Sequence, residues 1–271
     1  MLTTRETKAT GRRLGVAALA VLAAVSLAGC AGKDRMTTGS VGRDASRSLE
    51  TMSGRELASS VDTLGRSYTR NPKDVNAAMR YAQALQMNGR NDQALAVMRK
   101  LAIEHPSERQ VLAGYGKALA AAGELEPALD AVRRAQTPEY PDWKLISAEA
   151  AILDQLGQQN EARRLYTRAL EMKPGEPTVL SNLGMSHLLG GDLKGAERYL
   201  RQASQASGAD SRVRQNLALV VGLQGRFSEA EEIATREMSA DQAKANVTYL
   251  RSMLAQQNTW SQLRDEERST N

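Results

Sequence analysis

The sequence has very few of the side chains on which disulfides, metal clusters and base-stacking surfaces depend. Its 271 residues include one cysteine, two histidines, one phenylalanine, two tryptophans and seven tyrosines. A single cysteine excludes an internal disulfide and a cysteine-rich metal cluster. The aromatic rings are too few for a surface that stacks nucleic-acid bases. These scarcities favour a protein without a cofactor, a metal or a nucleic-acid ligand.

Catalytic motifs are equally scarce. No histidine–glutamate pair has the spacing of a zinc site, and no serine has the flanking residues of a nucleophile elbow. The stretch 114–117, Gly-Tyr-Gly-Lys, lacks the spacing and the following serine or threonine of a phosphate-binding loop. His105 falls at a predicted helix end, and His187 is expected to be a half-buried core residue. We therefore expect no enzyme and no small-molecule substrate.

The first 29 residues have the pattern of a signal peptide. Basic residues precede an apolar stretch, 14–27, that is too short to span a bilayer. This segment, residues 1–29, ends just before Cys30, and the sequence Leu-Ala-Gly-Cys resembles the bacterial lipobox, whose cysteine becomes the lipidated N-terminus. The resemblance implies that acyl chains on Cys30 tether the mature protein to membrane lipid.

Cleavage at that point also changes the charge of the chain. Residues 1–29 hold four basic residues and one acidic residue, so their removal lowers the net charge from +5 to +2. A charge this small gives little support to nucleic-acid binding. The residue after the cysteine is Ala31 and not aspartate, which by resemblance to enterobacterial sorting implies the outer membrane. We expect a lipid-anchored protein on the periplasmic face of the outer membrane of a Gram-negative bacterium.

Glycines mark an internal repeat. Five of them recur at a spacing of 34 residues: Gly89, Gly123, Gly157, Gly191 and Gly225. Two further sets of small residues have the same spacing, Ala82, Gly116, Ala150, Gly184 and Ala218 in one and Ala94, Ala128, Ala162, Ala196 and Ala230 in the other. This period predicts an all-α fold, a solenoid of five 34-residue helix-turn-helix units over residues 73–238.

The spacing within a unit predicts how its two helices meet. If the glycine is residue 15 of the unit, it suits the left-handed residue just past a helix C-terminus, and the other small residues fall at positions 8 and 20. These two positions lie symmetrically about the turn, so two antiparallel helices bring them face to face. Position 34 is acidic in every unit and is expected at the start of each first helix. Position 18, which is Ser228 in the fifth unit, is expected to cap the second helix, there with Glu231 in a capping box.

Residues N-terminal to the repeats are expected to form a linker and a cap. Residues 30–52 are largely glycine, serine, threonine and charged residues, which predicts a flexible linker after the lipidated cysteine. Ser53 and Glu56 form a second potential capping box ahead of an apolar pattern with helical spacing. Residues 53–72 are therefore expected to form an N-terminal capping helix.

The C-terminal end of the repeats is expected to be covered in the same way. Apolar residues at helical spacing predict an amphipathic helix over 239–258, which would cap the last unit as solenoid ends require. Residues 259–271 are mostly polar and charged, and we expect a mobile polar tail there.

Small residues at positions 8 and 20, with Pro72, Pro106 and Pro174 at position 32, resemble the tetratricopeptide repeat over about residues 75–238. In that family, positions 2, 5, 6, 9, 12 and 13 of the first helices build a concave face that binds protein segments. The resemblance implies a partner-binding groove at these residues: Met79, Gln83, Met87, Lys117, Asn182, Met185, Leu188, Leu189, Asn216, Leu219 and Leu223. Methionine and leucine suit an adaptable apolar groove, although the same side chains could instead contact neighbouring helices.

Two asparagines in this set stand at the same position of consecutive units. Asn182 and Asn216 both occupy position 6. In similar repeats an asparagine at this place bonds to the main chain of a bound peptide, which implies a clamp in the C-terminal half of the groove. A solvated or helix-capping role is the alternative.

A more specific resemblance lies in the fifth unit and the helix after it. The segments 213–231 and 245–254, within about residues 212–254, are similar to the TadD-type lipoproteins of Flp (tight adherence) pilus assembly. The resemblance implies a pilotin-like assembly factor that helps an outer-membrane secretin, or another pilus component, to localise or assemble. Two other roles stay open, a subunit of the β-barrel assembly machinery and a periplasmic regulator of cell-wall enzymes.

Overall fold

The structure is a computed structural model that describes residue 49 and residues 52–137, 139 and 141–269, with side chains described up to residue 256. The regular elements of these residues are the helices α2 to α13. The predicted signal peptide, Cys30 and most of the predicted linker lie outside the described residues. The chain divides into two compact units, residues 1–60 and residues 61–271, and the second of them holds every helix pair described below.

Helix α2 (Gly54–Arg70) begins at the capping box that the sequence predicts. The backbone N–H of Ser53 donates to Glu56 Oε2 at 2.7 Å, and the N–H of Glu56 donates to Ser53 Oγ at 3.4 Å. These reciprocal bonds confirm the capping box. The C-terminal half of α2 belongs to the second unit of the chain, where Tyr68 stacks on Tyr81 with ring centroids 5.6 Å apart.

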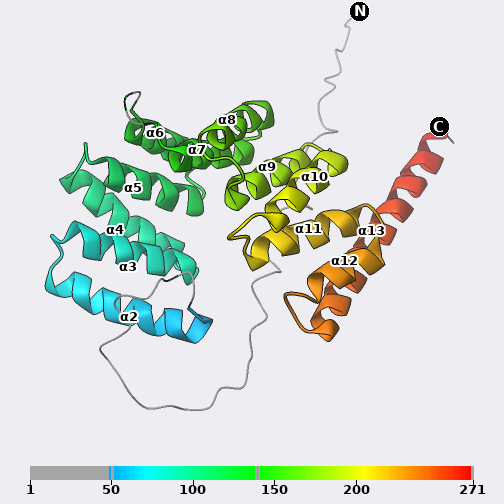
Figure 1. Ribbon diagram of the computed structural model, residues 1–271, viewed down its shortest axis with the longest axis horizontal. Coiled ribbons are helices and arrows are strands. Elements are labelled where there is room, and N and C mark those ends of the chain that lie inside the picture. Colours follow the sequence, from blue (N-terminus) through cyan, green and yellow to red (C-terminus); the bar gives the residue numbers. More distant parts are fainter. Residues whose placement is uncertain (1–48, 50–51, 138, 140, 270–271) are drawn as a thin grey trace, which may run out of the picture. The chain divides into compact units, whose positions relative to one another are not determined.

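Five helix pairs follow, coloured from cyan to orange in Figure 1. The first helix of each pair begins 34 residues after the one before: α3 Val75–Met87, α5 Arg109–Ala121, α7 Trp143–Gln155, α9 Pro177–Leu189 and α11 Ser211–Leu223. The second helices keep the same spacing: α4 Asn91–Glu104, α6 Leu125–Ala135, α8 Gln159–Met172, α10 Leu193–Gln205 and α12 Phe227–Ala234. The predicted all-helical repeat is confirmed, in the predicted register.

Each pair turns at the glycine at position 15. The φ angle of this glycine lies between 74° and 84° in all five units, a left-handed conformation that costs glycine little. The next N–H then bonds back to the carbonyl of position 11, as from Arg90 to Leu85 at 2.8 Å and from Asp192 to His187 at 2.9 Å. These bonds satisfy carbonyl groups at the helix end and confirm the role predicted for the glycines.

The two helices of a pair approach closely at positions 8 and 20, as predicted. A Cβ atom added to Gly184 would lie 3.1 Å from the carbonyl oxygen of Ala196 and 2.8 Å from Leu200 Cγ. In the second unit, a Cβ atom on Gly116 would lie 3.2 Å from the carbonyl oxygen of Ala128. The alanines at position 20 are at most 1% exposed in every unit. Small residues therefore set the distance between the two helices.

Position 34 is the N-cap of each first helix, as the sequence predicts. The carboxylates of three of these caps accept a backbone N–H of the first helical turn: Asp74 from Ala77 at 3.0 Å, Asp142 from Lys144 at 2.8 Å and Asp210 from Val213 at 3.1 Å. In the other two units the cap is a glutamate and its side chain makes no capping bond. The shorter aspartate side chain reaches the first turn, and the bond offsets an unpaired N–H there.

The prediction for the second helices is wrong by two residues. Their N-caps lie at position 16, directly after the glycine, and only Asp192 caps with its side chain, accepting the N–H of Gly195 at 2.9 Å. Position 18 is already inside the helix, so Ser228 is a helical residue and not the cap. The bond from the position 16 N–H to the preceding helix fixes the chain there, and the second helix begins at the following residue.

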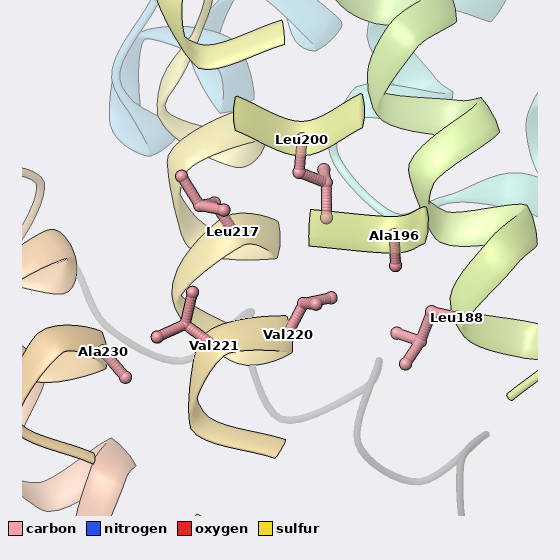
Figure 2. Close-up of a cluster of buried hydrophobic side chains, with 7 residues drawn as sticks. All are labelled: Leu188, Ala196, Leu200, Leu217, Val220, Val221 and Ala230. Carbon is pink, nitrogen blue, oxygen red and sulfur yellow. The ribbon is translucent and has the colours of Figure 1, made fainter. Parts of the chain in front are cut away.

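The core of the last two complete pairs shows how neighbouring units pack (Figure 2). Seven buried side chains from α9, α10, α11 and α12 converge in it: Leu188, Ala196, Leu200, Leu217, Val220, Val221 and Ala230. Leu200 and Val220 have no exposed surface. Because the cluster takes side chains from both units, burial of apolar surface holds each pair to the next.

Helix α13 follows the last pair and runs from Ala240 to Ser269. Its Leu250 lies over Gly222 of α11, where an added Cβ would be 2.6 Å from Leu250 Cδ2, and its Ala243 packs with Ala218 and Ala234. The prediction that the helix ends at 258, before a polar tail, is wrong. The helix continues to residue 269 because no glycine or proline interrupts residues 240–269. None of the described helices has both the length and the apolarity to cross a membrane.

Candidate partner-binding face

The first helices of successive units form one continuous layer. Each contacts the first helix of the next unit, from α3 through α5, α7 and α9 to α11, and α11 contacts α13. Helices α4, α6, α8 and α10 each pack between their own first helix and the first helix of the following unit, and α12 packs between α11 and α13. Side chains that point away from the second helices therefore lie on one uninterrupted surface.

Four positions of each first helix provide this surface, which we call the first-helix face. Positions 2, 6, 9 and 13 fall within roughly 60° of one another at 100° per residue. In all five units they are exposed or half-buried, whereas positions 3 and 10 are buried in nearly every unit. The members are Asn76, Arg80, Gln83, Met87, Gln110, Gly114, Lys117, Ala121, Lys144, Ala148, Ala151, Gln155, Thr178, Asn182, Met185, Leu189, Arg212, Asn216, Leu219 and Leu223.

Most of the predicted groove residues belong to this face. Met87 and Leu189 are 40% and 46% exposed, so part of each apolar side chain faces solvent. Met185, Leu219 and Leu223 are half-buried and contact the core cluster of Figure 2 with part of their surface. They therefore support the core while leaving an apolar surface beside Leu189.

Leu188 does not belong to the groove, contrary to the prediction. It is 5% exposed and is one of the seven side chains of the core cluster. Position 12 lies closer to position 8 around the helix than the other face positions do, so a leucine there turns into the packed interior. Met79 at position 5 is half-buried for the same reason.

The asparagine pair differs in its contacts. The side-chain amide of Asn216 donates to Ser181 Oγ at 3.3 Å, which joins α11 to α9. Asn182 is half-buried, and its side chain has no hydrogen bond within the described residues. One member thus takes part in packing between units, and the clamp on a bound segment stays a prediction.

A buried polar network joins the third and fourth units, and the sequence did not lead us to predict it. Ser186 has no exposed surface, and its hydroxyl donates to Asp154 Oδ1 at 2.7 Å. The buried Tyr166 hydroxyl also bonds to Asp154, and Arg163 donates to the Ser186 carbonyl oxygen at 2.9 Å. Burial raises the pKa of the Asp154 carboxyl above its ordinary value, against the opposing effect of these donors.

Replacing Ser186 by alanine is expected to destabilise the chain by about 1–2 kcal/mol, because the buried Asp154 carboxylate loses a donor. The same change should raise the pKa of Asp154 further. Chemical denaturation at neutral pH measures the loss. Ser228→Ala, at an exposed helical serine, is the control and should stay within about 0.5 kcal/mol of the parent. Equal stability of Ser186→Ala and the parent would contradict the role given to the network.

The same residues show no catalytic arrangement. His187 Nδ1 lies 2.9 Å from Asp192 Oδ2, and its ring is 5.1 Å from that of Tyr199, so the prediction of a half-buried packing residue holds. Ser186 donates its proton to a carboxylate, and no histidine bonds to its oxygen in the described part of the chain. A serine held in this way is not activated as a nucleophile. No cluster of three potential metal ligands occurs among the described residues.

Comparisons with known proteins agree with the repeat. Tetratricopeptide-repeat families match residues 153–219 and, in two overlapping copies, residues 52–108 and 82–142. Together they cover more than half of the chain. The chain belongs to the tetratricopeptide-repeat family.

One curated relative of this tetratricopeptide-repeat chain is cellulose synthase operon protein C of Pseudomonas fluorescens (strain SBW25), 27% identical over 166 residues. The match takes in 58% of the chain but only 12% of that much longer protein.

Three solved structures have the same fold. PilW, described as a widely conserved type IV pilus biogenesis factor, has a TM-score of 0.57 at 20% identity, over 76% of this chain and 94% of its own. A thermophilic repeat protein of Thermus thermophilus has a TM-score of 0.55 at 21% identity, over 65% and 97%. PilF of Pseudomonas aeruginosa has a TM-score of 0.51 at 15% identity, over 74% and 99%.

Ion pairs join neighbouring tetratricopeptide repeats on the second-helix side. Three arginines at position 25 each bind a glutamate of the following unit: Arg99 to Glu124 at 2.9 Å, Arg133 to Glu149 at 2.7 Å and Arg201 to Glu229 at 2.5 Å. The charges of these three arginines are thus neutralised by the fold itself. The contribution of each such pair to stability is small, and the three glutamates stand at different positions of their units.

A pocket between α4 and α5 has a volume of about 230 Å³. It is lined mainly by apolar atoms and flanked by Arg99 and Arg134. Its volume is below the roughly 300–1,000 Å³ of typical small-molecule sites. This pocket is therefore a poor candidate for a small-molecule site.

Proposed function

We propose that this protein is a membrane-anchored interaction scaffold that acts as a pilotin-like assembly factor of the Flp/Tad pilus secretion machine. The first-helix face carries the proposal, because it presents Leu189, Met185, Leu219 and Leu223 on a continuous layer of helices. Repeat proteins of this kind bind their partners on such extended faces. The chain is not an enzyme on this proposal, and its activity is the binding and placing of another protein.

The anchor in this proposal is Cys30. The lipobox resemblance around it supports lipidation, and the residue after it, Ala31, favours retention at the outer membrane. Two or more acyl chains hold a protein stably on a membrane, whereas a single chain binds only weakly and reversibly. The repeats would then work on the periplasmic face of the outer membrane, where a secretin is assembled.

The choice of partner rests on two resemblances. Residues 212–254 are similar to the TadD-type lipoproteins, and the fold is similar to that of PilW, a type IV pilus biogenesis factor. Both are proteins of pilus assembly. An outer-membrane secretin, or another component of the pilus machine, is therefore the partner we propose for the first-helix face.

Cross-linking in the native bacterium tests the function and the face together. A photoreactive amino acid at Met185 or Leu219 is expected to cross-link to the secretin, because both side chains lie on the first-helix face. The same group at Arg168, an exposed residue of α8, is the matched control and should give at least about tenfold less product. The products are identified by mass spectrometry.

The variant Cys30→Ser adds a test of the anchor in the same strain. We expect it to leave the membrane fraction and to lower the level of secretin multimers. Products from Leu219 that contain a β-barrel insertase or a cell-wall enzyme, and no pilus component, would contradict the proposal in favour of one of the two other roles. Unchanged secretin level, location and piliation after deletion of the gene would contradict it as well.

A further inference from the structure

The charges of the first-helix face all have one sign. Its charged members are Arg80, Lys117, Lys144 and Arg212, and no aspartate or glutamate belongs to it. The second helices differ, because they expose both signs, with acidic residues such as Asp92, Glu126, Asp130, Glu171 and Glu232. The whole chain has 36 basic and 31 acidic residues, so composition does not account for an acid-free face.

Three of these charges are not neutralised by the fold. Arg80, Lys117 and Lys144 are exposed on α3, α5 and α7, and none of them forms an ion pair within the described residues. The ammonium group of Lys144 lies 5.6 Å from the centre of the Trp143 ring, which orients it without cancelling its charge. Arg212 differs, since its guanidinium binds Asp210 at 2.8 Å.

Stability does not explain this arrangement. Lys144 is in the first turn of α7, where the positive end of the helix dipole disfavours a basic side chain. Three arginines of the second helices, Arg99, Arg133 and Arg201, are by contrast each paired with a glutamate of the next unit. The basic residues of the first-helix face are thus left available for groups outside the chain.

Four of the five large apolar residues of the face lie at its other end, and the fifth, Met87, is on α3. Met185 and Leu189 belong to α9, and Leu219 and Leu223 belong to α11. Consecutive first helices are in contact, so the basic part on α3, α5 and α7 continues directly into the apolar part on α9 and α11. A ligand that covers the face meets unpaired positive charge along one half and exposed apolar surface along the other.

We propose that the first-helix face binds a protein segment in which an acidic stretch adjoins an apolar stretch. The carboxylates of the segment lie over Arg80, Lys117 and Lys144, and its apolar side chains lie over Leu189 and Leu219. This inference rests on the proposed function, since it describes the partner of the same face. Pairs with the three basic residues contribute modestly to the affinity and set the orientation of the segment.

Synthetic peptides test the inference with the full chain, purified as Cys30→Ser to keep it in solution. The probe is a fluorescein-labelled peptide with a glutamate-rich first half and a leucine-rich second half, and its twins carry lysine or glutamine in place of glutamate. Fluorescence anisotropy is expected to show the glutamate peptide binding at least about tenfold more tightly than either twin. Its affinity should fall as salt is added.

Charge reversal on the protein provides the matched comparison. The double variant Arg80→Glu, Lys117→Glu is expected to weaken binding of the glutamate peptide at least about tenfold. Arg164→Glu with Arg168→Glu, two exposed residues of α8, changes the net charge equally and should alter the affinity by less than about twofold. Circular dichroism of all variants establishes that each is folded before binding is compared.

The outcomes separate this inference from the function on which it rests. The charge inference is overturned if the glutamine twin binds as tightly as the glutamate peptide. It is also overturned if the α8 variant loses as much affinity as Arg80→Glu with Lys117→Glu. In either case, cross-linking of the secretin at Leu219 would still support the function. No binding of the glutamate peptide overturns the charge inference too. If Arg80→Glu with Lys117→Glu removes binding to vesicles containing phosphatidylglycerol but not to the peptide, the basic half serves a lipid surface and the inference is wrong.

Discussion

Replacing Gly184 by valine is expected to lower the free energy of unfolding by about 3 kcal/mol and the melting temperature by roughly 10 °C. An added Cβ would lie 2.8 Å from Leu200 Cγ and 3.1 Å from the carbonyl oxygen of Ala196, so one of its neighbours is backbone. Leu200 has no exposed surface and is packed among the other residues of the core cluster. The two helices must separate to admit the side chain, and the packing of α10 on α11 is disturbed with them.

Gly114→Val is the control for this prediction. Gly114 is also inside a first helix, but the nearest atom to its added Cβ is the terminal methyl group of Met98 at 2.8 Å, and a flexible methionine end can move. Its effect should stay within about 1 kcal/mol. Differential scanning calorimetry and urea denaturation measure both variants. A similar loss in the two would show that valine in a helix, and not the approach of positions 8 and 20, causes the effect.

The helix pairs and their close approach could be predicted because each of these features requires a particular residue type or size at a fixed position of the unit. Only glycine adopts the left-handed turn at position 15 at little cost, and only a small residue fits at Gly184 or Ala196, so both constraints appear in every unit at the same spacing. The positions that point outward followed from the same register. The prediction for Leu188 is wrong because position 12 lies at the border between core and surface. There the packing of neighbouring side chains decides whether a residue is buried.

The sequence does not predict interactions that occur only once along the repeat. Asp154 stands at a position where the neighbouring units have leucine or alanine, and its donor Ser186 belongs to the next unit, so no period connects them. The start of the second helices was misjudged for another reason. Residue type predicts a cap at position 18, whereas the chain is fixed by a backbone N–H bond at position 16 that any residue except proline can make.

Acidification is expected to remove about 2–3 kcal/mol of stability through a single carboxylate, Glu197. The guanidinium of Arg226 binds this carboxylate, Gln224 donates to it at 2.8 Å, and Arg201 binds it at 2.7 Å. Together they lower the pKa of Glu197 from 4.5 to about 2. The side chain is 16% exposed, so solvent screens these contacts only in part.

The direction of the effect follows from the lowered pKa. A carboxyl that is more acidic in the folded chain than in the unfolded chain contributes its full stabilisation above pH 4.5, and loses it as the pH falls towards about 2. Unfolding free energies of the parent and of Glu197→Gln should therefore differ most near neutral pH and converge in acid. Glu126→Gln, at an exposed glutamate without an ion pair in the described residues, should follow the parent curve. Parallel curves for the parent and Glu197→Gln across this range would mean that the arginine contacts do not hold the carboxylate in solution.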